Sequence, residues 1–215
     1  MNENGKKKNL IALILNLAVV CFVLYTTISG IIEEGLFLFR YYTELSNLFG
    51  GIMAAIYSYY LIKRTKNIDY KVPGWCTELK FFAVCCLLQT FLIVVLVLAP
   101  QRGGWEGYRS LMFGRTTVCT HLLTPLTLAT SFLFFERDPL TKNIFRALIP
   151  TGIYAVVTIV LNLCKILYGP YFFLHVYEQS LVMTLIWCIV VLGVNALIVW
   201  GAGSLKKHLM KKQTV

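Results

Sequence analysis

The sequence predicts an all-α, polytopic integral membrane protein, and three observations lead to this prediction. Apolar residues make up 58% of the 215 residues, only 14% are charged, and the mean hydropathy of +0.70 lies outside the usual range of soluble proteins. Six runs along the chain approach the length of about 20 apolar residues that a helix needs to cross a bilayer. Lysine and arginine are concentrated in alternate connections between these runs. We therefore expect one domain, residues 1–215, of six transmembrane helices.

The predicted helices follow from the positions of the apolar runs. In chain order these are Leu10–Ser29, Leu45–Ile62, Leu79–Pro100, Leu111–Phe135, Phe145–Tyr168 and Leu181–Ala202. The first run follows three lysines, as the hydrophobic part of a signal peptide does, but it is longer than usual and no small-residue cleavage site follows it. We expect it to be retained as a helix. The connections are too short to fold by themselves, which predicts a single domain.

The cationic residues predict how the chain lies in the membrane, because cytoplasmic loops hold the excess of lysine and arginine. One predicted side holds both termini and the second and fourth connections. Its cations are Lys6, Lys7, Lys8, Lys63, Arg64, Lys66, Lys71, Arg137, Lys142, Arg146, Lys206, Lys207, Lys211 and Lys212. Both termini are therefore predicted to be cytoplasmic. We attribute the formal net charge of +10 to this topology and to attraction by anionic membrane lipids, and not to nucleic-acid binding.

The seven cysteines predict neither a metal site nor a disulfide framework. Nearly all lie inside apolar runs, without CxxC spacing and without histidines at ligand intervals. We interpret them as small apolar packing residues. No metal and no cofactor is expected.

Polar side chains open the second apolar run, in the stretch FRYYTELSNLFGG, residues 39–51. On a helix, Thr43, Ser46 and Asn47 share one face, and Arg40 can pair with Glu44 one turn away. Because this run enters from the predicted outer side, the polar face is expected in the outer part of the bilayer. The alternative is that these groups satisfy one another and that the hydroxyls bond their own helix backbone.

A second polar face occurs in the fourth run, in GRTTVCTHLLTPLTLATS. Thr117, His121 and Thr124 fall at positions i, i+4 and i+7, and Pro125 is able to kink the helix and loosen its backbone bonding. His121 is the only histidine inside an apolar run, and ionisable groups at such depth usually face a cavity or a partner. The alternative is a packing histidine bonded to a neighbouring helix.

The two polar faces together offer the parts of a nucleophilic site. A hydroxyl nucleophile needs a base, and a neutral imidazole is the usual base near neutral pH. Thr43 and His121 both lie near the predicted outer end of their helices, so they can meet if the second and fourth helices pack together. The sequence predicts this contact without proving it.

At these residues the chain resembles a known family. RYYTELSNL, HLLTP and GIYAVVTIVLNLCKILYGPYFFL are similar to segments of the androgen-induced-gene family of membrane threonine hydrolases and its bacterial six-helix relatives. The shared pattern is a basic residue, tyrosine, any residue and threonine opening the second helix, a histidine followed by a proline in the fourth, and Y-x-F-L after the fifth. The resemblance extends from about Phe39 to Leu174.

The resemblance implies that Thr43 is the nucleophile and His121 its base. It also implies a lipid-ester substrate, such as a fatty acid ester of a hydroxy fatty acid, and location in the cell membrane if the chain is bacterial. Pro125 stands four residues after His121, and Phe172 and His175 replace a proline and an acid expected after the fifth helix. These departures bear on the substrate and leave the threonine and histidine roles intact.

Several polar residues have two open interpretations. Asn47 is a candidate oxyanion donor and Arg40 a candidate binder of a carboxylate or phosphate head group, although each can equally hold helices together. Lys165 is expected to extend to the interface or to neutralise Glu44. His175 lies in an aromatic-rich outer loop that is typical of an interfacial belt and that can also act as a lid.

Three classes of function follow from these observations. A hydrolase uses Thr43 and His121 as a chemical pair, and its substrate is expected to be an amphiphile whose acyl chain enters between helices. A transporter of lipids or small molecules would have internal repeats and broken helices at the midplane, and the sequence has no clear repeat. A structural or regulatory membrane protein has no need of the pair. An acyl transferase would differ from the hydrolase only in its acceptor.

Overall fold

The computed structural model describes residues 3–67, 70–140 and 143–213, which form helices joined by turns and short loops, with no strand among them. Five helical stretches are long and apolar enough to cross a membrane: Glu3–Arg40, Tyr42–Lys66, Gly74–Gln101, Ile144–Leu163 and Leu181–Lys212. The prediction of an all-helical chain with several apolar helices of membrane-spanning length is confirmed in this form.

The first three apolar runs form the helices expected for them, with longer bounds. The elements are α1 (Glu3–Glu34), the 3₁₀ helix η1 (Gly35–Arg40), α2 (Tyr42–Lys66), α3 (Gly74–Ile93), the π-helical turn η2 (Val94–Leu98) and α4 (Ala99–Gln101). Tyr41 separates η1 from α2 because its backbone is extended, with φ −83° and ψ 133°. Arg40 therefore lies outside the helix that carries Thr43.

The fourth run is not one helix, so this prediction was wrong. Its first residues belong to the short helix α5 (Trp105–Met112), and bends and a turn over residues 113–116 then interrupt the helix. A side chain at Gly114 would clash, since its Cβ would lie 2.6 Å from the carbonyl oxygen of Ser110. The run resumes as one apolar helix over Cys119–Phe135, built from η3 (Cys119–Leu123), α6 (Thr124–Thr130) and η4 (Ser131–Phe135).

The last two runs form α7 (Ile149–Leu163), preceded by η5 (Ile144–Leu148), and α8 (Leu181–Gln213). Helix α7 ends before the predicted Tyr168. Lys165 has a φ of 58°, a left-handed conformation that a helix cannot continue through. The loop that follows includes the short η6 (Phe172–Leu174) and returns the chain to the start of α8.

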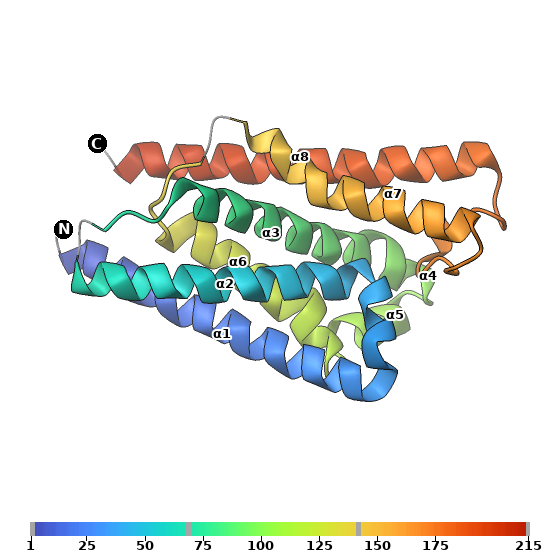
Figure 1. Cartoon of the computed structure of the whole chain (residues 1–215), viewed down its shortest axis with the longest axis horizontal. Helices are drawn as coiled ribbons and strands as arrows, with labels where there is room; N and C mark the ends of the chain where they lie inside the picture. Colours follow the sequence, from blue (N-terminus) through green and yellow to red (C-terminus); the bar gives the residue numbers. More distant parts are fainter. Residues whose placement is uncertain (1–2, 68–69, 141–142, 214–215) are drawn as a thin grey trace.

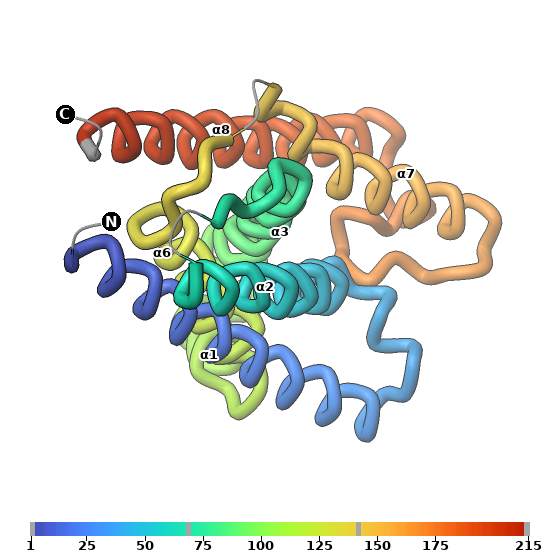
Figure 2. The backbone as a smooth tube through the Cα atoms, turned by 60° about the vertical axis from the view of Figure 1, so that its left-hand side comes forward, coloured from blue at the N-terminus to red at the C-terminus, as the bar shows by residue number. Residues whose placement is uncertain are grey.

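The helices form a bundle in which both ends of the described chain lie at the same end of the molecule (Figure 1). Helix α3 lies between the α1–α2 pair and the α7–α8 pair (Figure 2). Two adjacent glycines permit this packing on α2: a Cβ at Gly51 would lie 2.7 Å from Val23 of α1, and one at Gly50 would lie 2.6 Å from Leu87 of α3. The second connection lies at the end with the termini (Figure 1), and Lys142 of the fourth connection is outside the described residues.

Candidate functional site

Thr43 is the second residue of α2 and lies at the end of the bundle opposite to the termini. It is buried together with Ser46 and Asn47, so the prediction that these three residues share one helix face is confirmed. The hydroxyl of Tyr171 lies 3.3 Å from the Thr43 hydroxyl and 3.3 Å from its backbone nitrogen, whose N–H donates to it. The hydroxyl of Thr43, in the first turn of α2, is thus hydrogen-bonded to a residue of the loop after α7.

His121 lies on the π-helical turn η3, one turn before Pro125. Proline has no N–H for the carbonyl of His121, and this loosens the helix at the point where the π turn forms. The ring Nδ1 of His121 lies 2.6 Å from the carbonyl oxygen of Leu111. Because a carbonyl only accepts, Nδ1 carries the hydrogen, which leaves Nε2 of the neutral ring as a proton acceptor.

Thr43 and His121 line one polar cavity of about 500 Å³. No hydrogen bond joins the two side chains in this structure, and the Thr43 hydroxyl is bonded to Tyr171. Glu44 and Thr117 line the same cavity, as do the exposed residues Glu33 and Arg102, which connect it with the surface. The predicted contact between the second and fourth helices is confirmed, since Asn47 Nδ2 of α2 donates to the backbone oxygen of Thr120, at 3.1 Å.

Only two of the three residues predicted to form the second polar face, Thr117, His121 and Thr124, lie beside the polar cavity. Thr117 and His121 both border the polar cavity, but Thr124 is fully buried away from it. The Thr117 hydroxyl donates to the backbone oxygen of Ser110, at 2.9 Å. The predicted i, i+4, i+7 alignment assumed a regular α-helix, and the π turn at Cys119–Leu123 alters that spacing.

An apolar cavity of about 60 Å³ lies on the other side of Thr43. Thr43 and Tyr171 line both this apolar cavity and the polar one, and they form the boundary between them. Thr90, Trp187 and Val191 are among the side chains that enclose the apolar cavity. The hydroxyl of Thr43 is therefore positioned between a polar and an apolar space.

Asn47 and Arg40 do not line the polar cavity that holds Thr43 and His121. The Nδ2 of Asn47 donates to the backbone oxygens of Thr43 and Thr120, so its N–H groups are used within the bundle. Arg40 pairs with Glu34, at 3.5 Å, and not with Glu44, because the extended Tyr41 takes it off the α2 axis. The helix-joining interpretation of Asn47 holds, and the predicted Arg40–Glu44 pair was wrong.

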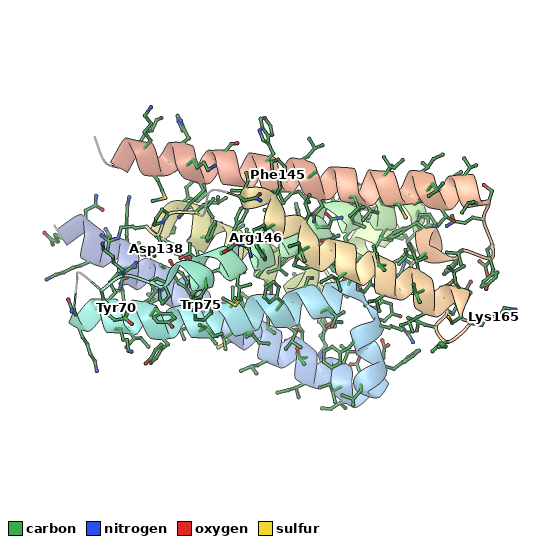
Figure 3. The ribbon with its side chains drawn as sticks, turned by 45° about the horizontal axis from the view of Figure 1, so that its top comes forward. Tyr70, Trp75, Asp138, Phe145, Arg146 and Lys165 are labelled. Carbon is green, nitrogen blue, oxygen red and sulfur yellow. The ribbon has the colours of Figure 1, made fainter. Side chains whose placement is uncertain are left out.

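Lys165 and His175 lie outside the cavity that holds Thr43. Lys165 projects from the end of α7 (Figure 3) and stacks over the ring of Tyr177, with its Nζ 5.4 Å from the ring centre, so it does not neutralise Glu44. His175 bonds through Nε2 to the carbonyl of Gly169 and through Nδ1 to Glu178. These contacts tie the loop to itself.

Glu178 in this loop also accepts a hydrogen bond from the Tyr168 hydroxyl, at 2.6 Å. That bond favours the ionised carboxylate and lowers the pKa of Glu178, and nearby His175 acts in the same direction. The loop after α7 is therefore held by its own polar contacts at the end of the bundle where the site lies.

Charged side chains at the opposite end of the bundle are buried, and they bond one another or backbone oxygens. We call this group the ionic cluster; its members are Arg64, Lys80, Glu136, Asp138 and Lys206. Arg64 and Lys206 had been interpreted as loop cations, yet they are only 5% and 0% exposed. Asp138, which accepts from Arg64, lies toward the end of the molecule opposite to Lys165 (Figure 3).

The members of the ionic cluster join four segments of the chain. Lys80 on α3 donates to the Glu136 carboxylate and to Asn16 Oδ1 on α1. Lys206 on α8 donates to the backbone oxygens of Phe132 and Glu136, where a cation suits the carbonyl end of a helix. Two signals were present in the sequence: Lys80 lies inside the third apolar run, and Glu136 follows the fourth directly.

Tyr171 was not among the predicted site residues, although it begins the Y-x-F-L segment on which the resemblance rests. Its contact with Thr43 joins residues 128 positions apart, which no local pattern reveals. All seven cysteines are free. No group of three or more possible metal ligands occurs among the described residues.

Comparison of the chain with protein-family models, with curated proteins and with solved structures finds no match in any of the three. The polar cavity is the feature of the molecule that bears on its function. Its geometry offers a buried hydroxyl at a helix N-terminus, an imidazole with a free Nε2, and access from the surface.

Proposed function

We propose that this protein is an intramembrane lipid-ester hydrolase with Thr43 as its nucleophile and His121 as its base. The observation that carries the proposal is that both residues line one polar cavity while the Nδ1 bond to Leu111 leaves the Nε2 of His121 free to accept a proton. The substrate is a fatty acid ester, for example a fatty acid ester of a hydroxy fatty acid, as the resemblance implies.

The reaction proceeds in two steps. Thr43 Oγ1 attacks the ester carbonyl carbon while its proton passes to Nε2 of His121, and the alcohol leaves with that proton as the acyl-threonine forms. Water, deprotonated by the same imidazole, then attacks the acyl-threonine; the fatty acid is released, and the proton passes from His121 back to Thr43 Oγ1 as that oxygen leaves. A tetrahedral oxyanion near Thr43 is favoured by the positive end of the α2 dipole; the N–H of Thr43 itself donates to the Tyr171 hydroxyl.

The polar cavity also supports water as the acyl acceptor. Its lining includes Glu33 and Arg102, which are exposed, so water reaches the space around His121. An acyl transferase would need the same pair and a site for a second alcohol. Measuring released fatty acid against transesterified product, with an added alcohol, distinguishes the two reactions.

The topology that goes with this function has six transmembrane segments and both termini in the cytoplasm. Five of these segments are the long apolar helices, and the remaining one, fourth in chain order, is the apolar helix Cys119–Phe135. Its 17 residues are fewer than the about 20 that a full span needs. This arrangement brings Thr43 to the outer leaflet. Single cysteines at Lys66 and Arg137 are expected to react with a membrane-impermeant maleimide only after the membrane is opened, and labelling in sealed cells would contradict the topology.

Active-site labelling tests the nucleophile directly. The protein is purified in detergent, treated with a fluorophosphonate and digested, and the modified residue is mapped by mass spectrometry. We expect modification at Thr43, lost in Thr43→Ala and weakened in His121→Ala. Modification at Ser46 or Cys119 with equal labelling of Thr43→Ala would assign the chemistry to another residue.

A further inference from the structure

A lateral groove of about 510 Å³ lies between α2 and α7, on the side of Thr43 away from the polar cavity. Its lining is almost entirely apolar and includes Leu45, Ile153 and Val157, which are 39%, 60% and 50% exposed. In a bundle that crosses a membrane, a groove of this kind faces the acyl chains of the surrounding lipid. An apolar space beside a candidate nucleophile suits the fatty part of an ester.

The apolar cavity next to Thr43 is too small to hold such a chain by itself. Its volume of about 60 Å³ is less than half of the roughly 150 Å³ that admits benzene in a protein interior. It therefore accepts an acyl tail of only about two or three carbons. A longer chain has to leave this cavity, and the groove is the adjoining space with room for it.

Two tyrosine rings separate the apolar cavity from the groove. Tyr42 and Tyr154 line both spaces, and their ring centres lie 5.1 Å apart with the planes inclined at 64°. The Tyr42 hydroxyl is 2.7 Å from the Thr151 hydroxyl, and the Tyr154 hydroxyl donates to the backbone oxygen of Arg40, at 2.8 Å. Displacing either ring would make the cavity and the groove one continuous space.

We propose that the apolar cavity and the lateral groove form the acyl-chain site, with the Tyr42–Tyr154 pair as its gate. This proposal rests on the proposed function. The ester carbonyl lies at Thr43, the alcohol lies in the polar cavity, and the acyl chain passes between the two rings into the groove. The ligand class is a long-chain fatty acyl ester that enters directly from the bilayer.

A matched pair of substitutions on α7 tests the groove. Val157 and Val160 are both 50% exposed on the same helix, but only Val157 lines the groove. The measured quantity is the ratio of kcat/KM for p-nitrophenyl laurate to that for p-nitrophenyl acetate, in the same detergent. Val157→Trp is expected to lower this ratio at least about tenfold, as steric exclusion from an apolar pocket does, and Val160→Trp to leave it unchanged. Equal ratios in the two variants would overturn the proposal.

The gate is tested by two substitutions at one position. Tyr154→Ala removes the ring and is expected to raise the laurate-to-acetate ratio, because the passage to the groove stays open. Tyr154→Phe keeps the ring, loses the bond to Arg40, and is expected to leave the ratio nearer to wild type. If the Phe variant changes the ratio as much as the Ala variant does, the ring is not the gate.

A binding measurement separates the acyl site from the catalytic proposal. Trp187 lines the apolar cavity, whereas Trp200 on α8 does not. In Thr43→Ala proteins retaining only one of these tryptophans, doxyl-labelled stearate is expected to quench Trp187 saturably and in competition with palmitate. Trp200 is expected to show only the unsaturable quenching of the micelle. Saturable quenching of Trp187 without any ester hydrolysis by the wild type would support the acyl site and contradict the hydrolase proposal. Hydrolysis at Thr43 with unsaturable quenching of Trp187 would support the hydrolase and contradict the acyl site.

Discussion

At the end of the bundle that holds the termini, Lys80 and Glu136 are 0% and 3% exposed and are bonded to each other. At the opposite end, Thr43 and His121 are both 7% exposed, yet they face a cavity of about 500 Å³. The two regions are similarly buried and differ in their partners. In the ionic cluster both carboxylates are paired with cations and Lys206 is bonded to backbone oxygens, whereas the cavity leaves Nε2 of His121 free.

This difference separates the polar groups to which we assign a structural role from those for which we propose a reactive one. A buried charge without a partner is costly, and each ion of the cluster has at least one oppositely charged or hydrogen-bonding neighbour. The imidazole of His121 is neutral and satisfied at one nitrogen only, which fixes its ring without using the basic atom. Substitutions in the cluster should therefore act on stability, and substitutions in the cavity on activity.

The largest expected effect is loss of activity on substituting the pair itself. Thr43→Ala and His121→Ala should each lower ester turnover at least about 10³-fold, and the double variant should be scarcely worse because the two act as one unit. Thr43→Ser should retain some turnover, since it preserves the hydroxyl. Folding should be nearly intact, because one threonine hydrogen bond contributes about 1 kcal/mol. A well-folded Thr43→Ala protein that hydrolyses lipid esters at the wild-type rate would refute the assignment.

Next in size is the loss of stability on breaking the ionic cluster. Lys80→Met leaves the buried Glu136 without its ion-pair partner and should lower the free energy of unfolding by about 3–5 kcal/mol. Lys80→Met combined with Glu136→Leu should recover most of that loss, because a buried pair replaced by apolar residues is often neutral. Thermal unfolding in detergent measures both. Loss of turnover in a folded Lys80→Met protein would show that the ionic cluster contributes to the reaction, and would contradict the distinction between the cluster and the polar cavity.

A smaller effect is expected at Tyr171, which borders the polar and apolar cavities. Tyr171→Phe removes the hydroxyl that bonds Thr43 and keeps the ring. Loss of a hydrogen bond of about 1 kcal/mol should lower kcat roughly fivefold, with little change in thermal stability. Steady-state kinetics beside a melting curve is the measurement. If kcat is unchanged while KM rises, the hydroxyl serves ground-state binding only.

The smallest effect is expected at His175, which tests the comparison between two histidines. Both ring nitrogens of His175 are bonded within the loop after α7, whereas one nitrogen of His121 is free. His175→Ala should change turnover less than about twofold, as surface substitutions usually do. The assay is the one used for His121→Ala. A loss comparable with that variant would bring the loop into the reaction as a lid.

Part of the candidate site could be predicted from helical periodicity alone. The i, i+3, i+4 spacing of Thr43, Ser46 and Asn47 places them on one face wherever the segment is helical, and they are buried together. The alignment of Thr117, His121 and Thr124 failed because the π turn before Pro125 changes the period. Arg40 missed Glu44 because Tyr41 is extended. Periodicity is reliable only as far as the helix remains regular.

The sequence by itself determined the helical, apolar character of the chain, since about 20 apolar residues in a run satisfy their backbone bonds only as a helix in lipid. It also determined the candidate pair, through a histidine and a threonine in apolar surroundings. Only the tertiary structure decided that Thr43 bonds Tyr171, that His121 faces the same cavity, and that Lys80 meets Glu136. These contacts join distant segments, and packing between helices sets them because no local spacing encodes which faces meet.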